Sequence, residues 1–106
     1  MTREIVEDVI QEIPAKTLTW GKTSDKELNW KEAKYWCEKQ GGRLPTLIEL
    51  QEAYADEKIR GSFQPVGYYW SSTETSANYA YYVNFLNGLT DYGAKAYTYL
   101  YVRCVR

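Results

Sequence analysis

Residues 29–50 read NWKEAKYWCEKQGGRLPTLIEL, and this stretch predicts two helices separated by a sharp break. Asn29 stands at an N-cap position with Glu32 three residues later, and Thr46 repeats the arrangement with Glu49. Each pair has the pattern of a capping box, in which two side chains satisfy backbone N–H groups at the start of a helix. The Gly-Gly pair between them is typical of a helix C-terminus. We therefore expect one helix on each side of these glycines, the second beginning after Thr46 and running to Lys58.

The sequence around the two helices predicts further short elements. Residues 5–13 fit either a helix with one apolar face or a strand, and residues 17–20 favour a strand. Three runs of β-forming residues follow Gly61, at 68–73, 79–86 and 97–105. The pattern predicts a single α+β domain over residues 1–106, in which two helices pack on short antiparallel strands.

Side-chain alternation assigns the residues of these strands to faces. In the run 79–86, Val83 and the other odd-numbered positions point to one side of the strand and the even-numbered positions to the other. Asn87-Gly88 follows this run and predicts a tight hairpin turn. We expect the side that carries Val83 to face the core.

The chain has two cysteines, Cys37 and Cys104, which lack the CxxC spacing of a redox or zinc site. They are either bridged or two buried thiols. Cys37 shares a predicted helix face with Ala33, and Cys104 shares a strand face with Val102. Both faces point toward the core, which favours the disulfide. A bridge would suit an exported or surface context.

The composition argues against nucleic acid and membrane as partners. The formal net charge is -1, so the chain has no electrostatic attraction to phosphate. No apolar run approaches the roughly 18 residues of a membrane span. Acidic residues interrupt the apolar positions of residues 1–14, so we expect neither a signal peptide nor a transmembrane segment. Localisation stays undetermined, although display on a cell or virion surface would suit a cysteine pair.

Catalytic side chains are scarce. The sequence has no histidine, and Glu74 and Asp91 are the only acids in its last third. General base and nucleophile pairs are therefore missing. We expect a protein that is not an enzyme and has no cofactor.

Three motifs carry a family resemblance: GGRLPT at 41–46, YYWSSTE at 68–74 and YVRCVR at 101–106. With NWKEAKYWC ahead of them and VNFLNG between, they resemble a C-type-lectin-fold domain of the branch that is similar to formylglycine-generating enzymes. Within that branch, the chain most resembles the variable proteins of diversity-generating retroelements. The resemblance covers roughly residues 17–106. It implies a fixed scaffold over residues 1–78 and a variable ligand-binding region at about 79–100.

In such variable proteins, adenine-directed mutagenesis turns AAY codons into any codon that ends in a pyrimidine. These codons cannot encode Met, Trp, Gln, Lys or Glu. The five types occur 25 times in residues 1–70 and twice in residues 71–106, where a distribution in proportion to length would place about nine. Strand propensity explains part of this depletion. It does not explain Gly93, Ala94 and Ala96, which are poor strand formers.

The resemblance assigns roles to individual positions. Scaffold positions after residue 69 are Trp70, Ser71, Ser72, Thr73, Glu74, Phe85, Gly88, Lys95, Tyr101, Val102 and Arg103. Candidate ligand-binding residues are Tyr79, Tyr82, Asn84, Leu86, Leu89, Thr90, Asp91, Tyr92, Gly93, Ala94, Ala96, Tyr97, Thr98, Tyr99 and Leu100. Tyrosine suits this role because it offers a large, rigid contact area with a polar tip. We further expect Arg43 to pair with Glu74 or to satisfy backbone groups.

The expected ligand is a protein or another macromolecule, and the oligomeric state stays open. An invariant adhesin domain that binds a glycan or matrix polymer is the alternative function, and an oligomerisation module is a third. A calcium site is not expected, because the sequence lacks the Glu-Pro-Asn loop and Trp-Asn-Asp strand that supply calcium ligands in sugar-binding relatives. Formylglycine-generating chemistry needs reactive cysteines, and both cysteines here are committed to the predicted core.

Overall fold

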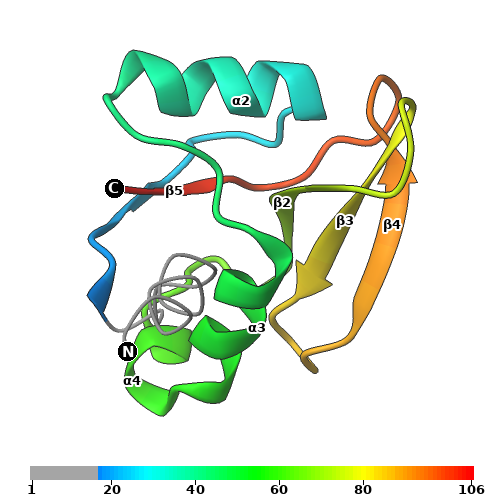
Figure 1. Ribbon diagram of the computed structural model, residues 1–106. Helices are drawn as coiled ribbons and strands as arrows, with labels where there is room; N and C mark the ends of the chain where they lie inside the picture. The colour runs from blue at the N-terminus through cyan, green and yellow to red at the C-terminus, as the bar shows by residue number, and fades with distance from the viewer. Residues whose placement is uncertain (1–16) are drawn as a thin grey trace, which may run out of the picture.

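The computed structural model describes residues 17–106, and the element expected at 5–13 lies outside this range. The chain has the α+β fold that its sequence predicts, with two small antiparallel sheets (Figure 1). The elements are β1 (Trp20–Thr23), α2 (Trp30–Lys39), α3 (Leu47–Ala55), α4 (Glu57–Gly61), β2 (Tyr68–Glu74), β3 (Tyr79–Asn84), β4 (Thr90–Ala94) and β5 (Arg103–Val105). No helix in this part of the chain is long and apolar enough to cross a membrane.

Both predicted capping boxes are present. Glu32 N–H donates to the Asn29 side chain over 2.9 Å, and the Glu32 carboxylate accepts from Asn29 N–H over 3.0 Å. Thr46 and Glu49 make the same reciprocal pair at the start of α3. The helix α2 ends at Lys39, and Gly41 follows with a φ of 76°, a value that favours glycine. The local signals were therefore enough to place both helix starts.

The second helix is shorter than its sequence pattern predicts. The predicted helix runs to Lys58, but α3 stops at Ala55 and a separate short helix, α4, begins at Glu57. The Asp56 side chain between them accepts hydrogen bonds from the N–H groups of Lys58 and Ile59. Because this carboxylate caps a new helix, it competes with continuation of the old one.

The strand boundaries also differ from the prediction. The strand expected at 17–20 lies at 20–23 instead. The run 97–105 is not one strand: only Arg103–Val105 belongs to β5, which pairs with β1. A strand that was not expected, β4, occupies Thr90–Ala94 and pairs along its whole length with β3. Asp, Gly and Ala are poor strand formers, so tertiary pairing overrides local propensity here.

The turn at Asn87-Gly88 is confirmed in place, although it is longer than a two-residue hairpin. Residues 85–89 connect β3 to β4, and Asn84 N–H donates to the Leu89 carbonyl over 2.9 Å. Gly88 has a φ of 79°, and a Cβ there would lie 2.5 Å from the Tyr54 ring. Both the backbone conformation and the packing therefore require glycine at this position.

Two packed clusters form the core. One surrounds Trp70 and joins α2 to the sheets, and the other surrounds Phe63 and joins α3 to β2 and β3. In the second cluster the rings of Phe63 and Phe85 stack with centroids 4.0 Å apart. In Figure 1, α2 lies at one end of the molecule, α3 and α4 lie at the other, and the three-stranded sheet stands at the side.

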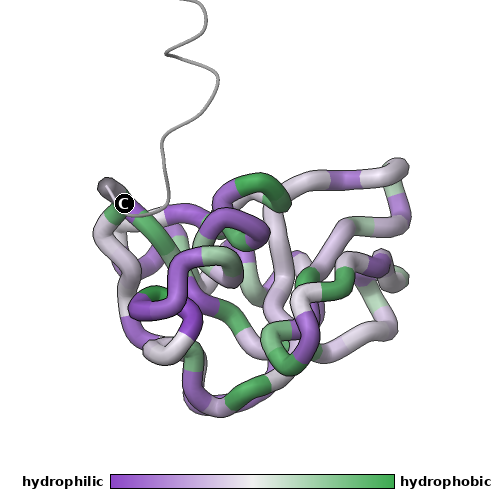
Figure 2. The backbone as a smooth tube through the Cα atoms, turned by 90° about the horizontal axis from the view of Figure 1, so that it is seen from below, coloured by the Kyte–Doolittle hydropathy of each residue, from purple (hydrophilic) through white to green (hydrophobic). Residues whose placement is uncertain are grey.

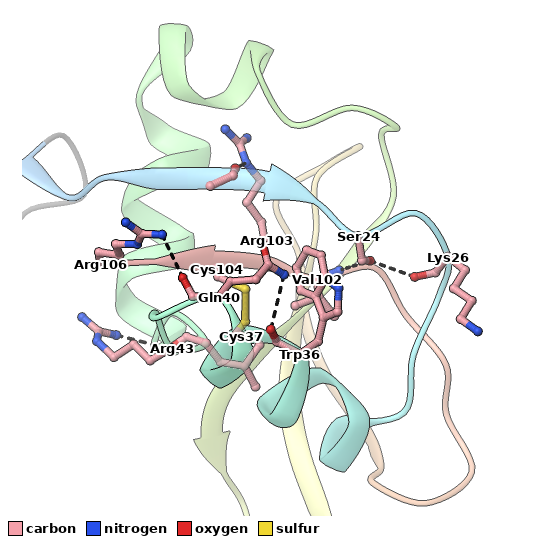
Figure 3. The surroundings of a disulfide bond; sticks show 12 residues. Ser24, Lys26, Trp36, Cys37, Gln40, Arg43, Val102, Arg103, Cys104 and Arg106 are labelled. Atoms are coloured by element: carbon pink, nitrogen blue, oxygen red, sulfur yellow. Dashed lines mark hydrogen bonds between the residues drawn. A yellow bond between two sulfur atoms is a disulfide. The ribbon is translucent and has the colours of Figure 1, made fainter.

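A disulfide joins Cys37 of α2 to Cys104 of β5, as the shared core faces predicted. Both cysteines are buried. Figure 3 shows this bridge, with Gln40 beside it accepting a hydrogen bond at its backbone carbonyl from Arg106 over 2.8 Å. The bridge fixes the last strand against the first well-defined helix.

The ion pairs differ from the one that the sequence suggested. Arg43 does not pair with Glu74, but it satisfies a backbone group as the alternative predicted, because its guanidinium donates to the Leu44 carbonyl over 3.2 Å. Its guanidinium makes two parallel hydrogen bonds to the buried Glu49 carboxylate, over 2.8 and 2.9 Å. Glu74 pairs with Lys95 instead. The partner of Arg43 is thus the capping-box carboxylate at the start of α3, which is six residues away in sequence.

We expect reduction of the disulfide to destabilise the domain strongly. The bridge closes a loop with a sequence separation of 67 residues. Restricting an unfolded loop of this length is worth about 4 kcal/mol at 25 °C. Urea denaturation with and without a reductant should show a loss of this size. An unchanged midpoint after complete reduction, verified by thiol titration, would contradict the prediction.

The Arg43–Glu49 pair predicts a pH dependence of stability. Burial opposes ionisation of Glu49, but hydrogen bonds from Arg43 and Thr46 outweigh it and lower the pKa of Glu49 below its ordinary value. The stabilisation is thus complete above the unfolded-state pKa and is lost as pH falls through the lower folded-state pKa. Glu49→Gln should lower the free energy of unfolding at pH 7 by about 2 kcal/mol. It should also weaken the decline of stability below about pH 4.5. The exposed control Glu38→Gln should behave like the unmodified protein in urea titrations at each pH.

Candidate ligand-binding surface

The hairpin of β3 and β4 carries most of the predicted binding residues, and its register divides them between two faces. Tyr79 pairs with Ala94, Tyr81 with Tyr92 and Val83 with Thr90, so these six share one face. We call it the α3 face, because Gln51 of α3 donates to the Thr90 hydroxyl over 3.0 Å. The opposite face, here the α2 face, carries Ala80, Tyr82, Asn84, Asp91 and Gly93. A single flat surface does not contain all the predicted residues.

The exposed predicted residues lie at the rim of the hairpin and in the segment that follows it. Tyr97 is the most open, with 85% of its surface exposed. The other large exposed side chains of the predicted set are Tyr79, Leu86, Leu89, Tyr92 and Tyr99. The three-stranded sheet is mostly pale in Figure 2, because Tyr, Thr, Gly and Ala have intermediate hydropathy. Exposed aromatic rings in a segment with few charged side chains suit contact with a macromolecule.

Two predicted residues pack against the rest of the domain: Leu100 is buried, and Tyr82 is half-buried. Leu100 is only 8% exposed and exchanges backbone hydrogen bonds with Leu28, so it belongs to the core and not to a binding surface. Tyr82 is half-buried, with its ring 6.0 Å from that of Trp70 and 5.5 Å from that of Tyr68. Burial is the main cause that raises the pKa of Tyr82, and the charge of Asp91 adds to it. Tyr82 therefore stays a neutral hydroxyl over the physiological range.

Three tyrosines meet edge to face on the α3 face of the hairpin. The rings of Tyr79 and Tyr92 lie 5.8 Å apart at 85°, and those of Tyr81 and Tyr92 lie 6.4 Å apart at 89°. Such pairs are worth about 0.5–1.5 kcal/mol beyond their buried area. Tyr81 was expected to point inward with Val83, and the structure leaves it half-buried beside Tyr92. Edge contacts of this kind hold large side chains in fixed orientations before a ligand arrives.

A cavity of about 680 Å³ lies where the start of α2 meets the end of the hairpin. The predicted residues in its lining are Tyr79, Ala94, Ala96 and Tyr97. Scaffold residues complete it: Asn29, Trp30, Lys31, Ala77, Asn78 and Lys95. None of these was predicted as a ligand-binding residue, and Lys95 was assigned to the scaffold; only the tertiary fold brings residues 29–31 to the hairpin. Alanines and two exposed tyrosines make the cavity shallow, apolar and aromatic at its rim.

Lys95 holds the walls of this cavity together. Its ammonium group pairs with Glu74, donates to the Ala77 carbonyl over 2.8 Å and lies 4.3 Å from the Trp30 ring centre. Its backbone accepts from Trp30 N–H over 3.1 Å and donates to the Asn78 carbonyl over 2.9 Å. The hydrogen bond from Lys95 lowers the pKa of Glu74. This lysine is a structural residue, and its charge is already neutralised.

Residues 17–106 contain no group of three or more His, Cys, Asp or Glu side chains that could hold a metal ion. The chemistry available at the cavity and at the rim of the hairpin is that of tyrosine hydroxyls, amides and apolar contacts. Such groups suit non-covalent binding.

A family match identifies the chain as a C-type-lectin-like, ligand-binding domain. The chain belongs to the Lcl C-terminal domain family, whose model matches residues 12–106, and this C-type-lectin-like family is linked to variable proteins. A search among curated proteins found no match. The family match covers the cavity, the hairpin and the disulfide.

We expect Lys95→Met to loosen the cavity while keeping most of the fold. The substitution removes the contacts to Glu74 and to the Ala77 carbonyl but retains an apolar chain against Trp30. Backbone amides of residues 76–79 should exchange with solvent faster, whereas amides within α2 should not. Lys39→Met, at an exposed position of α2, is the matched control and should leave residues 76–79 unchanged. Equal exchange in both variants would contradict the structural role of Lys95.

Proposed function

We propose that the domain is a non-enzymatic binding protein whose surface over residues 79–99 is diversified by a retroelement to bind varied macromolecular targets. One observation carries the proposal. The five residue types that pyrimidine-ending codons cannot encode occur after residue 70 only as Glu74 and Lys95. These two side chains form an ion pair with each other, and Lys95 also donates a hydrogen bond to the Ala77 carbonyl. Both exceptions therefore have a structural role.

The distribution of contacts supports the same proposal. Several bonds that hold the hairpin to the rest of the domain come from Ser71 and Lys95, which the family resemblance assigns to the scaffold. The side chains of Tyr97 and Tyr99 project into solvent instead. Surface substitutions away from packed features usually change stability by less than about 0.5 kcal/mol. Exposed positions of this kind can therefore be rewritten without loss of the fold.

The test is a displayed library. Positions 79, 86, 89, 92, 97 and 99 are randomised with pyrimidine-ending codons and sorted for binding to one purified protein, for example hen egg-white lysozyme. A control library randomises the exposed α2 positions 34, 35, 38 and 39, which lie outside the cavity, in the same way. We expect the first library to display as well as the unmodified domain and to yield specific binders, and the control library to yield few or none. Poor display of the first library, or equal yields from both, would contradict the proposal.

A second prediction concerns the exposed tyrosines in any selected binder that retains them. Tyr97→Ala should weaken affinity at least about tenfold, since aromatic side chains dominate interface energetics. Tyr35→Ala removes another exposed tyrosine, from α2 and outside the proposed surface, and should leave affinity unchanged. Titration of both variants by surface plasmon resonance compares them directly. Equal losses would show that binding does not depend on this surface.

A fixed adhesin domain that binds a glycan is the alternative, and the cavity flanked by Tyr79 and Tyr97 is the observation that favours it. Aromatic rings beside amides can stack on sugars. In that case the unmodified domain, without selection, should bind members of a glycan array. The variants Tyr79→Ala and Tyr97→Ala should then lose that binding together.

A further inference from the structure

Gly93 lies in a close-packed position that has no room for a side chain. A Cβ at residue 93 would lie 2.9 Å from Thr98 Oγ1, 3.2 Å from Thr98 Cγ2 and 3.2 Å from the Tyr82 ring. All three positions belong to the predicted binding region, so this contact joins β3, β4 and the segment after β4. Ordinary carbon contacts require about 3.5–4.0 Å, and any larger residue at 93 must displace a neighbour.

The two neighbours differ in their freedom to move. Tyr82 is held between the rings of Trp70 and Tyr68 on the α2 face. Both branches of Thr98 face Gly93, so any rotation of its side chain leaves at least one branch against position 93. The displacement must therefore be taken up by the backbone that carries Thr98.

That backbone has few restraints of its own. Lys95 and Leu100 anchor its two ends through hydrogen bonds to Trp30, Asn78 and Leu28. Between these anchors, the only hydrogen bonds that residues 96–99 make within the described part of the chain run from Tyr97 N–H and Thr98 N–H to the Ala94 carbonyl, over 3.3 and 3.0 Å. A displacement of Thr98 therefore lengthens or bends these two hydrogen bonds directly. The same segment contributes Ala96 and Tyr97 to the cavity wall.

We infer that the residue at position 93 sets the position of the 96–99 segment, and through it the shape of the cavity and the placement of Tyr97. Gly93 is a positioning residue of the binding surface, and Thr98 is the residue on which it acts. The inference rests on the proposed function, because it concerns the surface assigned to ligand binding. The exposed tyrosines contact the target, whereas residues 82, 93 and 98 set the backbone geometry beneath them.

In a diversified surface, the residues at positions 93 and 98 form a coupled pair. Every amino acid that a pyrimidine-ending codon encodes, apart from glycine, has a Cβ. A change of Gly93 should therefore be accompanied by a smaller residue at 98, or by a shifted segment that presents Tyr97 differently. One position with no ligand contact of its own changes the binding specificity of its neighbours.

The test is a double-mutant cycle with matched glycine controls. Gly93→Ala should lower Tm by roughly 5–15 °C, the range expected for overpacking a small domain. In a Thr98→Ala background, which lacks both contacting atoms, the same change should cost far less. Gly61→Ala, where a Cβ would meet nothing within 4 Å, should be neutral. Gly41→Ala, at positive φ but also in open space, reports backbone strain without a clash.

Hydrogen exchange separates a positioning role from general destabilisation. In Gly93→Ala the amides of Tyr97 and Thr98 should exchange at least about tenfold faster, while amides of α2 keep their rates under strongly native conditions. Restoration of slow exchange in the double variant would support the inference. An equal cost of Gly93→Ala in both backgrounds, or faster exchange throughout the chain, would overturn it.

The cycle involves no ligand, so its outcome is independent of whether the display library yields binders. If binders are obtained, one that retains Gly93, Tyr97 and Thr98 extends the test. Gly93→Ala should weaken its affinity at least about tenfold at a temperature well below Tm. Thr98→Ala added to that variant should restore most of the affinity. An unchanged affinity in Gly93→Ala would also overturn the inference.

Discussion

The buried Trp70 and its neighbour Ser71 connect several separate parts of the chain. Trp70 donates from its indole nitrogen to the Leu28 carbonyl over 2.9 Å and from its backbone to Tyr101 over 3.1 Å. Trp30 returns an indole hydrogen bond to the Ser71 carbonyl over 2.8 Å, and the Ser71 hydroxyl donates to Tyr81. This pair of residues thus holds the start of α2, the segment before β5 and the strand β3. An unpaired buried indole N–H would be costly, so the arrangement is specific as well as stable.

The binding surface is built outward from this connection. The disulfide fixes α2 against β5, and Lys95 attaches the far end of the hairpin to Trp30. The residues that hold the hairpin are thus few and lie at its base and its end. Exposed side chains such as Tyr97 and Tyr99 contribute little to the core, and they can differ without altering the frame.

The sequence predicted best where structure depends on near neighbours. Asn29 and Thr46 mark both helix starts, because capping needs only residues three positions apart. The strand β4 was missed because Asp91, Gly93 and Ala94 have no strand preference of their own. Their pairing with β3 depends on a turn and on tertiary contacts. Local capping signals are therefore more reliable than strand propensity in this chain.

The candidate surface was predicted in outline only. Exposure of Tyr92, Tyr97 and Tyr99 follows the prediction, whereas burial of Leu100 and the packing of Tyr82 could not be read from alternation alone. The cavity combines hairpin residues with Asn29 and Lys31, which are more than 60 positions away in sequence from Lys95 at its other side. Such a site depends on the three-dimensional path of the chain, and no motif in the sequence records it.

The most direct test of the account is the sequence of the DNA next to this gene. A diversified surface requires a near-identical copy of the segment that encodes residues 79–100, with adenines at the differing positions, beside a reverse-transcriptase gene. The account predicts that these differences fall on the codons of exposed residues such as Tyr92, Tyr97 and Tyr99, and that the codons of Trp70, Glu74 and Lys95 are identical in both copies. Absence of the repeat, together with invariant sequence in related genomes, would contradict diversification and leave a fixed binding domain.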